Sequence, residues 1–496
     1  MSQIYFSLLL AGMNIAVFNH RINMERNLKT ENIKKGHKTF LVEPLMLPIF
    51  FITALITLLV IDSDLHISTV LANWGLLFLY ISIYYALLLL LLPLLRQVIR
   101  AWACATLWLI PNFLYITSYI TKNTVYPYPR LVVTVPHQLL STLIWIWAIG
   151  FVCVIVWQFI SHFRYRRLLL KNAEEFTDNT ILSSWYNEAK RHGIKHKIPV
   201  MISKTISTPI TIGCFNRTMR LVLPKQNYTE EDFSLIFRHE LRHILRADTR
   251  TKMFMGFCAA ICWFNPLSWV ARRKTSDDLE LSCDEAVLAD TDEITRRQYA
   301  ELLLKNAGNS RGYTTCLSAS ANSLRYRLRN IVKPTKRFSG SVVVGIAIIA
   351  LVMMVGTVAV ADSSTTVQTA IFDKASTGIA INYIEAYKWG ENQKNYGNVY
   401  GWNEELLTRY IASLHAKQLY SEGYTINIDD VLLLVNYKEV IDGKVTSIIQ
   451  FIITDKLLFV SIPYDDYGNI TFLLEDEIDW SYLNTLLDFN AKNPNP

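Results

Sequence analysis

Residues 233–246 read Phe-Ser-Leu-Ile-Phe-Arg-His-Glu-Leu-Arg-His-Ile-Leu-Arg. His239 and His243 stand four residues apart, so both imidazoles leave the same face of a helix and can bind one metal ion. Glu240 follows the first histidine, where its carboxylate can take a proton from a water molecule at that ion. The stretch therefore predicts a Zn2+-binding helix with Glu240 as its catalytic base.

The residues before and around this stretch support a helix. Thr229 is a favourable N-cap, and residues 230–232 are acidic, which suits the positive end of the helix dipole. Glu240 shares a mostly apolar face with Ile236 and Ile244, so we expect it to point inward, where a carboxylate needs a partner. The alternative is a surface helix that carries two histidines by chance.

The composition points to a membrane protein with two chemically different parts. The chain has 496 residues and is 51% hydrophobic, and the apolar residues gather in long runs. Residues 363–496 hold 9 Lys and Arg against 18 Asp and Glu, whereas residues 1–362 hold 40 against 24. This asymmetry suggests two sides of a membrane. Because the last of the seven cysteines is Cys316, the acidic part contains no disulfide.

The apolar runs and their charged flanks predict a topology. We expect spans at residues 4–18, 41–61, 74–95, 102–120, 139–160 and 342–360. The segments 19–40, 96–100 and 162–171 are basic, and with these spans all three fall on the same side of the membrane. By the positive-inside rule, that side is the cytoplasm. For any single run, the alternative is a helix buried in a soluble core.

The expected fold class is a multi-pass α-helical membrane protein with an inserted α+β gluzincin-like zinc metalloprotease domain and a small α+β extracellular C-terminal domain. The predicted parts are a transmembrane bundle (1–161), a cytoplasmic protease domain (162–339), a last transmembrane helix (340–362) and an extracellular domain (363–496). In the last part, a linker is expected at 363–366, helices at 404–419 and 480–489, and strands at 430–439, 445–454 and 456–463.

The third metal ligand should come from the acidic segment 277–285. We assign it to Glu280, and Asp284, one turn later, should hold a ligand histidine from behind. Asp277, Asp278 and Glu285 read as a solvated face. We expect Cys283 to leave the helix in another direction from Glu280 and not to be a ligand.

Two further features of this domain have open interpretations. Short strands near 199–204 and 219–224 could align an extended peptide beside the metal helix, or could be a plain structural hairpin. Arg238, Arg242, Arg246 and Arg250 recur every four residues; we expect them to face anionic headgroups, with acidic side chains as the alternative. Residues 324–336 read as a basic helix at the membrane surface.

With these motifs in order, the chain resembles the bacterial BlaR/MecR-type antibiotic-sensor transducers. The resemblance rests on His239-Glu240-Leu241-Arg242-His243, Asn265-Pro266 and Glu280-Leu281-Ser282-Cys283-Asp284, and covers most of residues 40–362. It implies that His239, His243 and Glu280 bind zinc and that Glu240 is the base. It also implies a protease in the bacterial cell membrane that cuts itself or a cytoplasmic transcriptional repressor when an external domain senses a signal.

The C-terminal part departs from the best-known relatives of this type. Residues 363–496 contain neither the Ser-x-x-Lys nor the Lys-Thr-Gly motif of penicillin-binding sensors. We therefore expect a sensor of another, unidentified extracellular ligand. The other expected partners are membrane lipids and the protein substrate; direct nucleic-acid binding is not expected, and the sequence allows a homodimer without indicating one.

Three other classes of protein share parts of the pattern. A prenyl-protein-endopeptidase-like membrane protease has the same His-Glu-x-x-His and Glu-x-x-x-Asp arrangement, but a large domain after the last span argues against it. A non-catalytic receptor scaffold would not need His239, Glu240, His243 and Glu280 intact. A transporter would be expected to show an internal repeat and charges deep in the spans.

Overall fold

The computed structural model separates the chain into two compact units, which are described one at a time. It describes residues 48–49, 51–53, 64–115, 129–171, 173–194, 196–215, 217–289, 291–307, 321–333, 337–354, 358–373, 383–390, 393–398, 402–420, 433–441, 444–461 and 469–486. The first unit comprises Met1–Ile61, Phe78–Ile116 and Trp147–Met353, and the second comprises Asp62–Leu77, Thr117–Ile146 and Met354–Pro496. The predicted first span and most of the second lie outside the described residues.

Two described helices are long and apolar enough to cross a membrane. They are Trp74–Val98, within α3 (Asp64–Val98), and α6 (His137–Lys171). Large side chains of α6 such as Ile149, Val152 and Trp157 are exposed. Because an apolar surface of this kind is unfavourable in water, it fits a lipid-facing helix better than the core helix of a soluble protein.

The other two predicted spans within the described residues take different forms. α4 (Ala101–Leu109) leads into the 3-10 turn η1 (Ile110–Phe113), where Pro111 interrupts the predicted span. α13 (Ser341–Met354) begins where the last span was expected. The end of that prediction is wrong, because Val358–Ala361 forms strand β6. The run Val-Ala-Val-Ala is apolar enough for a span, but its β-branched residues also suit a buried strand.

The part of the first unit that contains the predicted metal helix is built on a small sheet of order β2-β3-β5-β4. Its strands are β2 (Ala173–Glu175), β3 (Val200–Ser203), β4 (Ile210–Ile212) and β5 (Arg220–Pro224). β3 and β5 are parallel, and β4 pairs antiparallel with β5 at the edge of the described sheet. The helices α7 (Asn179–Arg191) and α8 (Glu230–Arg246) share an apolar core with this sheet.

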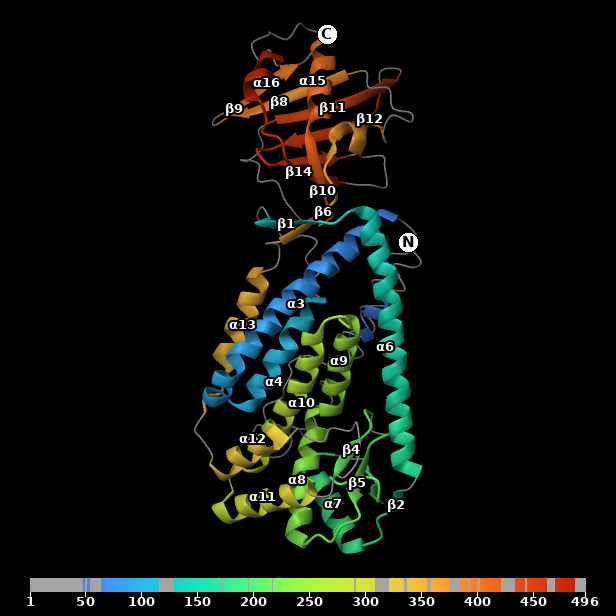
Figure 1. The fold of residues 1–496 in the computed structure, drawn as a ribbon, viewed down its shortest axis with the longest axis vertical. Helices are drawn as coiled ribbons and strands as arrows, with labels where there is room; N and C mark the ends of the chain where they lie inside the picture. The colour runs from blue at the N-terminus through green and yellow to red at the C-terminus, as the bar shows by residue number, and fades with distance from the viewer. Residues whose placement is uncertain are drawn as a thin grey trace. The chain divides into compact units, whose positions relative to one another are not determined.

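Four further helices follow in this part of the first unit (Figure 1): α9 (Asp248–Ile261), α10 (Pro266–Val287), α11 (Glu293–Ala307) and α12 (Ala321–Val332). α10 packs against α4, α8 and α9, so one helix joins the apolar helices to the predicted metal helix. α12 is not a surface anchor over its whole length: Ile331 lies in the apolar core and Arg327 is buried.

Polar contacts attach α10 to its apolar neighbours at two points. Asp278 accepts hydrogen bonds from Arg96 Nε, at 2.8 Å, and from Trp108 Nε1, at 2.9 Å. Glu285 accepts one from the Ala101 amide at 3.1 Å and forms an ion pair with Arg337. The prediction that Asp278 and Glu285 belong to a solvated face is therefore wrong. We refer to these contacts as the α10 clamp.

The second unit is a long, mainly antiparallel sheet of order β1-β6-β10-β14-β13-β12-β11-β8-β9, with β7 (Thr365–Thr366) also paired to β10. The strands are β1 (Leu131–Thr134), β8 (Tyr383–Gly390), β9 (Gln393–Asn398), β10 (His415–Leu419), β11 (Leu433–Ile441), β12 (Lys444–Ile453), β13 (Leu457–Ser461) and β14 (Asn469–Leu474). The π-helical turn η3 (Gln368–Phe372), α15 (Trp402–Ser413) and α16 (Trp480–Leu486) share its core.

Two details of this unit differ from the sequence predictions. The expected linker at 363–366 includes β7, and the expected helix 404–419 ends at Ser413, after which His415–Leu419 is strand β10. β1 precedes α6 in the chain, yet it pairs in parallel with β6, from Leu131 opposite Val358 to Thr134 opposite Ala361. Segments far apart in sequence therefore build one sheet.

Candidate metal centre and active site

α8 places the two histidines and Glu240 as its sequence predicts. Thr229 and Asp232 form a reciprocal capping box at its start. Phe237, Leu241 and Ile244 are buried on one side, and the Phe237 ring lies 5.0 Å from that of Trp185. This burial fixes the rotation of α8 about its axis and so the direction of its polar side chains.

Three donor atoms form a triangle that suits a tetrahedral metal ion. His239 Nε2 lies 3.1 Å from His243 Nε2, and Glu280 Oε2 lies 3.5 Å from each of them. Ligands bonded at about 2.0–2.1 Å in a tetrahedral arrangement stand about 3.3–3.4 Å apart. The three predicted ligands therefore fit such an ion without rearrangement of the backbone.

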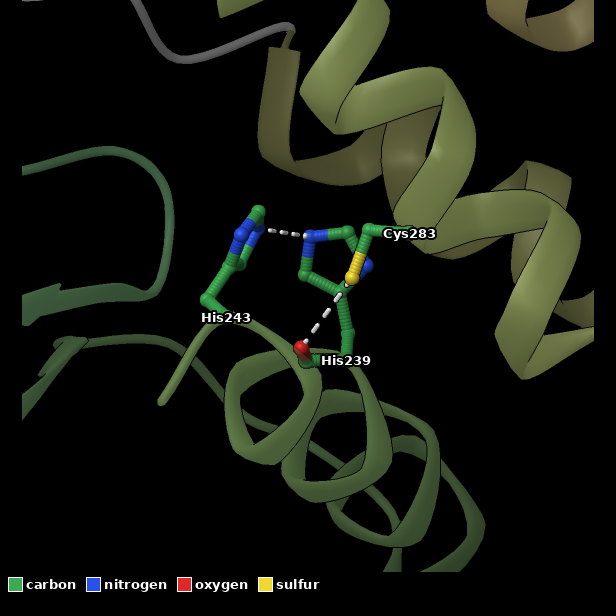
Figure 2. Close-up of side chains that lie close together, drawn as sticks. All are labelled: His239, His243 and Cys283. Carbon is green, nitrogen blue, oxygen red and sulfur yellow. Dashed lines mark hydrogen bonds between the residues drawn. The ribbon is translucent and has the colours of Figure 1, made fainter. Parts of the chain in front are cut away.

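Cys283 joins this cluster, contrary to the sequence prediction. Its Sγ and one ring nitrogen each of His239 and His243 lie within 4.8 Å of one another. Figure 2 shows these three side chains together. The thiol also donates a hydrogen bond to the His239 carbonyl oxygen at 3.3 Å. The prediction failed because residues three apart on a helix share a face, and Cys283 is three residues after Glu280.

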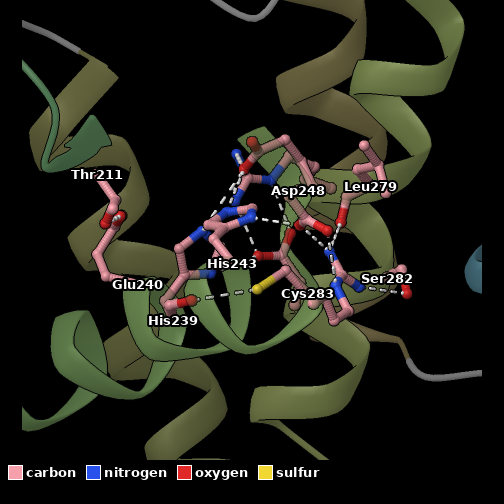
Figure 3. A network of polar contacts seen from close by, with 12 residues as sticks. Thr211, His239, Glu240, His243, Asp248, Leu279, Ser282 and Cys283 are labelled. Atoms are coloured by element: carbon pink, nitrogen blue, oxygen red, sulfur yellow. Dashed lines mark hydrogen bonds and ion pairs between the residues drawn. The ribbon is translucent and has the colours of Figure 1, made fainter. Parts of the chain in front are cut away.

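Buried partners hold both histidines by their second ring nitrogen (Figure 3). Asp248 Oδ2 lies 2.6 Å from His243 Nδ1, and Asp248 also pairs with Arg246. Ala247, with φ of 58°, makes the left-handed turn between α8 and α9 that brings Asp248 back over His243. Such contacts fix the tautomer and orientation of a metal-binding imidazole.

Asp284 acts on His239 through an intermediary. Its Oδ1 is 3.6 Å from His239 Nδ1, too far for a hydrogen bond. Tyr299 bridges the gap, since its hydroxyl lies 2.8 Å from His239 Nδ1 and donates to Asp284 Oδ1 at 2.7 Å. Arg327 of α12 donates to both Asp284 oxygens, at 2.7 and 2.8 Å. Asp284 is thus near its predicted place, but Tyr299 makes the contact.

Glu240 is buried, with 5% of its surface exposed, and has one defined partner. The Thr211 hydroxyl donates to Glu240 Oε2 at 2.6 Å. Thr211 lies in β4, so the edge strand of the sheet and the predicted catalytic base are in direct contact. A hydrogen bond of this kind fixes the carboxylate while its other oxygen stays available for a proton.

The electrostatics of the cluster favour a cation. Burial alone would lower the pKa of His239, but the Cys283 thiol and the Glu280 carboxylate raise it to about 10. Burial would raise the pKa of Glu280, but His243 and Lys252 hold it well below its usual range. The negative surroundings that stabilise a proton on these imidazoles also stabilise a metal ion in its place.

The arginines of α8 and α9 do not form the predicted headgroup-facing stripe. Arg246 is bonded to Asp248, to the Ser282 hydroxyl at 2.8 Å and to the Leu279 carbonyl at 2.9 Å. Arg250 is buried and donates to the Cys214 carbonyl oxygen at 3.1 Å. Two of the four therefore hold the site together, and the alternative of acidic partners is correct for Arg246.

Asp248→Asn tests the support of His243. We expect the affinity for the metal ion to fall about 10- to 100-fold, because Asn is a weaker acceptor for the Nδ1 proton and leaves the ring less firmly oriented. Competition against a chromophoric chelator measures the affinity. Glu293→Gln, at an exposed residue of α11, is the matched control and should leave it unchanged. Equal affinities in Asp248→Asn and the control would contradict this role.

Sequence reasoning did not find Thr211, Tyr299 or Arg327, and did not predict the contact between Asp248 and His243. Asp248 lies five residues after His243, a short enough spacing for the contact to have been suspected. The other three come from β4, α11 and α12, and their sequence positions carry no signal of proximity. Only the fold brings them to the site.

The buried histidines and carboxylates can hold a metal ion, and comparison with known proteins shows which family this part of the chain is similar to. Residues 127–331 match the family model described as BlaR1 peptidase M56, so this part of the chain is similar to that family. The BlaR/MecR resemblance seen in the sequence is confirmed. M56 is a metallopeptidase family, which agrees with the donor triangle.

Curated relatives are similar to part of this chain. Regulatory protein BlaR1 of Bacillus licheniformis is 26% identical over 184 residues, covering 37% of this chain and 30% of that protein. The methicillin resistance mecR1 proteins of Staphylococcus aureus and Staphylococcus epidermidis are 24% identical over 168 residues, covering 32% of this chain and 28% of theirs. The chain thus spans less than a third of the length of these relatives.

Proposed function

We propose that this chain is a membrane-embedded zinc metalloendopeptidase that acts in transmembrane signalling. It would cleave itself, a cytoplasmic transcriptional repressor, or both, in response to an external signal. The observation that carries the proposal is the triangle of His239, His243 and Glu280 beside the buried carboxylate of Glu240. The BlaR1-type family match favours this function over the prenyl-protein-endopeptidase alternative.

The chain's own residues have distinct tasks in hydrolysis. His239, His243 and Glu280 would hold the zinc ion, which when bound supplies Lewis-acid polarisation of a carbonyl and acidifies water. Glu240 takes the proton of the attacking water and delivers it to the leaving amine. Thr211 keeps the Glu240 carboxylate in position through its 2.6 Å hydrogen bond. The edge of β4 with which no described strand pairs is suited to align an extended substrate peptide as a further strand.

The membrane setting is part of the same proposal. Two long apolar helices, the basic segments at 96–100 and 162–171, and the acidic composition of residues 363–496 support a multi-pass protein with a cytoplasmic peptidase domain and an external C-terminal domain. The α10 clamp supports a physical connection between the apolar helices and Glu280, since Asp278 is two residues away on the same helix.

Metal removal tests the proposed chemistry. Dialysis of the purified protein against a strong chelator should abolish cleavage, and added Zn2+ should restore it. Proteomic comparison of cells that express the chain or its Glu240→Gln variant should reveal the substrate as a fragment present only with Glu240. Retained cleavage after complete metal removal, or identical fragments in both cell types, would sink the proposal.

A further inference from the structure

Cys283 is a buried thiol that the proposed cleavage reaction does not use. It lies on α10, one turn after Glu280, and its Sγ points toward the two histidines (Figure 2). Metal–sulfur and metal–nitrogen bonds of about 2.3 and 2.0–2.1 Å would place Sγ about 3.5 Å from each ring nitrogen. These atoms lie within 4.8 Å here, so a shift on the order of 1 Å brings the sulfur into bonding position.

The thiol has two positions open to it. In one, seen in the structure, it donates to the His239 carbonyl oxygen at 3.3 Å. In the other, the sulfur would lie at the point shared by the three donor atoms, close to both imidazoles. A catalytic metal site needs its fourth position open, whereas four protein ligands make a closed site. A sulfur bound at the fourth position would therefore leave no place for the attacking water.

The charges around the site favour the second position once a divalent ion is bound. Three carboxylates, of Asp248, Glu280 and Asp284, contact three cations, of Arg246, Lys252 and Arg327, so these partners balance. A divalent ion adds two positive charges. The Glu240 carboxylate supplies one negative charge, and a Cys283 thiolate would supply the second. Neutrality matters here because an unbalanced charge in a buried site is unfavourable.

The surroundings of the thiol agree with this. Cys283 is buried beside both imidazoles. A cysteine binds a metal ion as the thiolate, and positive charge next to the sulfur stabilises that form.

We propose that Cys283 supplies a thiolate as fourth ligand that closes the metal site in the resting protein, and that its withdrawal onto the His239 carbonyl opens the site for cleavage. On closing, the thiol releases its proton to solvent as the sulfur binds. On opening, the sulfur regains a proton and water takes its position, so no oxidant or reductant is needed. The inference rests on the proposed function, because it assumes the same metal ion.

The α10 clamp connects the proposed closure of the metal site to the apolar helices. Asp278 and Glu285 stand on either side of Cys283 along α10, and both are held by residues of, or next to, the apolar helices. A small rotation of α10 driven by those helices would move Cys283 relative to His239 and His243 on α8. Packed helices can shift by such amounts between two discrete arrangements.

Cobalt substitution tests the ligand directly. We expect the full-length protein, loaded with Co2+ in detergent or nanodiscs without other additions, to show an intense near-ultraviolet band from thiolate-to-cobalt charge transfer. Cys283→Ala should bind Co2+ but lose this band. Cys153→Ala and Cys214→Ala, at cysteines outside the cluster, should keep it. A band that persists in Cys283→Ala, or a wild-type protein that binds Co2+ without any such band, overturns the inference.

A second measurement needs no variant. X-ray absorption of the zinc-loaded wild-type protein should require one sulfur neighbour at about 2.3 Å. A fit by nitrogen and oxygen neighbours alone overturns the thiolate ligand but leaves the proposed peptidase intact. Failure of the wild-type protein to bind either metal removes the proposed function itself, so the two failures are distinguishable.

The closure also has a consequence for activity. Cys283→Ala should raise the basal rate of Glu240-dependent cleavage at least severalfold, because the fourth position is then permanently open. The double variant Cys283→Ala/Glu240→Gln should show no such cleavage. A basal rate in Cys283→Ala equal to or below that of the wild type contradicts a closing role.

Discussion

Glu240→Gln is expected to lower the rate of peptide cleavage by about 10²- to 10⁴-fold while the protein keeps its metal ion. The amide has nearly the shape of the carboxylate and can still accept the hydrogen bond from Thr211. It cannot take a proton from water at neutral pH. The donor triangle of His239, His243 and Glu280 does not include residue 240, so the metal ion should stay bound at saturating concentration.

The measurement has two parts, a cleavage rate and a metal occupancy, which are determined on the same samples. The rate at which the Glu240-dependent fragment forms gives the catalytic effect, and metal analysis of the same samples gives the occupancy. Glu231→Gln is the matched control, because Glu231 is an exposed carboxylate in the first turn of the same helix. Cleavage within a few-fold of the wild-type rate in Glu240→Gln would exclude Glu240 as the base.

The helix that carries Glu240 shows how much of the site is local in sequence. The cap at Thr229, the apolar face and the four-residue spacing of His239 and His243 act within one helix, so the sequence contains all that is needed to predict them. Glu280 could be predicted because its spacing from Asp284 follows a known motif. The failure at Cys283 was an error of helical geometry, not a lack of information.

The supports of the site depend on tertiary contacts that sequence patterns do not encode. Tyr299 and Arg327 read as ordinary residues of amphipathic helices, and their burial beside Asp284 follows only from how α11 and α12 pack. The sequence predicted that a helix continues through the residues of strand β10, because these residues have no strong strand preference. In the structure, pairing with β14 holds them as a strand. Pairing partners override weak local propensity.

The α10 clamp gives the second large prediction. Arg96→Met should lower the free energy of unfolding by about 3–5 kcal/mol, since it leaves the Asp278 carboxylate buried without its cation. Asp278 is fully buried, and its remaining bond is that from Trp108 Nε1, at 2.9 Å. Denaturant-induced unfolding in detergent at pH 8 measures the effect, because Asp278, with a pKa that burial raises to about 6, is ionised there.

Two further variants test whether the unpaired charge of Asp278 causes the loss of stability in Arg96→Met. Arg96→Met/Asp278→Asn should lose less stability than Arg96→Met alone, because the amide is neutral and still accepts the Trp108 hydrogen bond. Arg297→Met, which removes an exposed ion pair with Glu293, should change stability by less than about 1 kcal/mol. If Arg96→Met and Arg297→Met lower the free energy of unfolding by equally small amounts, the clamp does not hold α10. A double variant as unstable as Arg96→Met would show that packing of the Arg96 side chain, and not its charge, fixes the helix that carries Glu280.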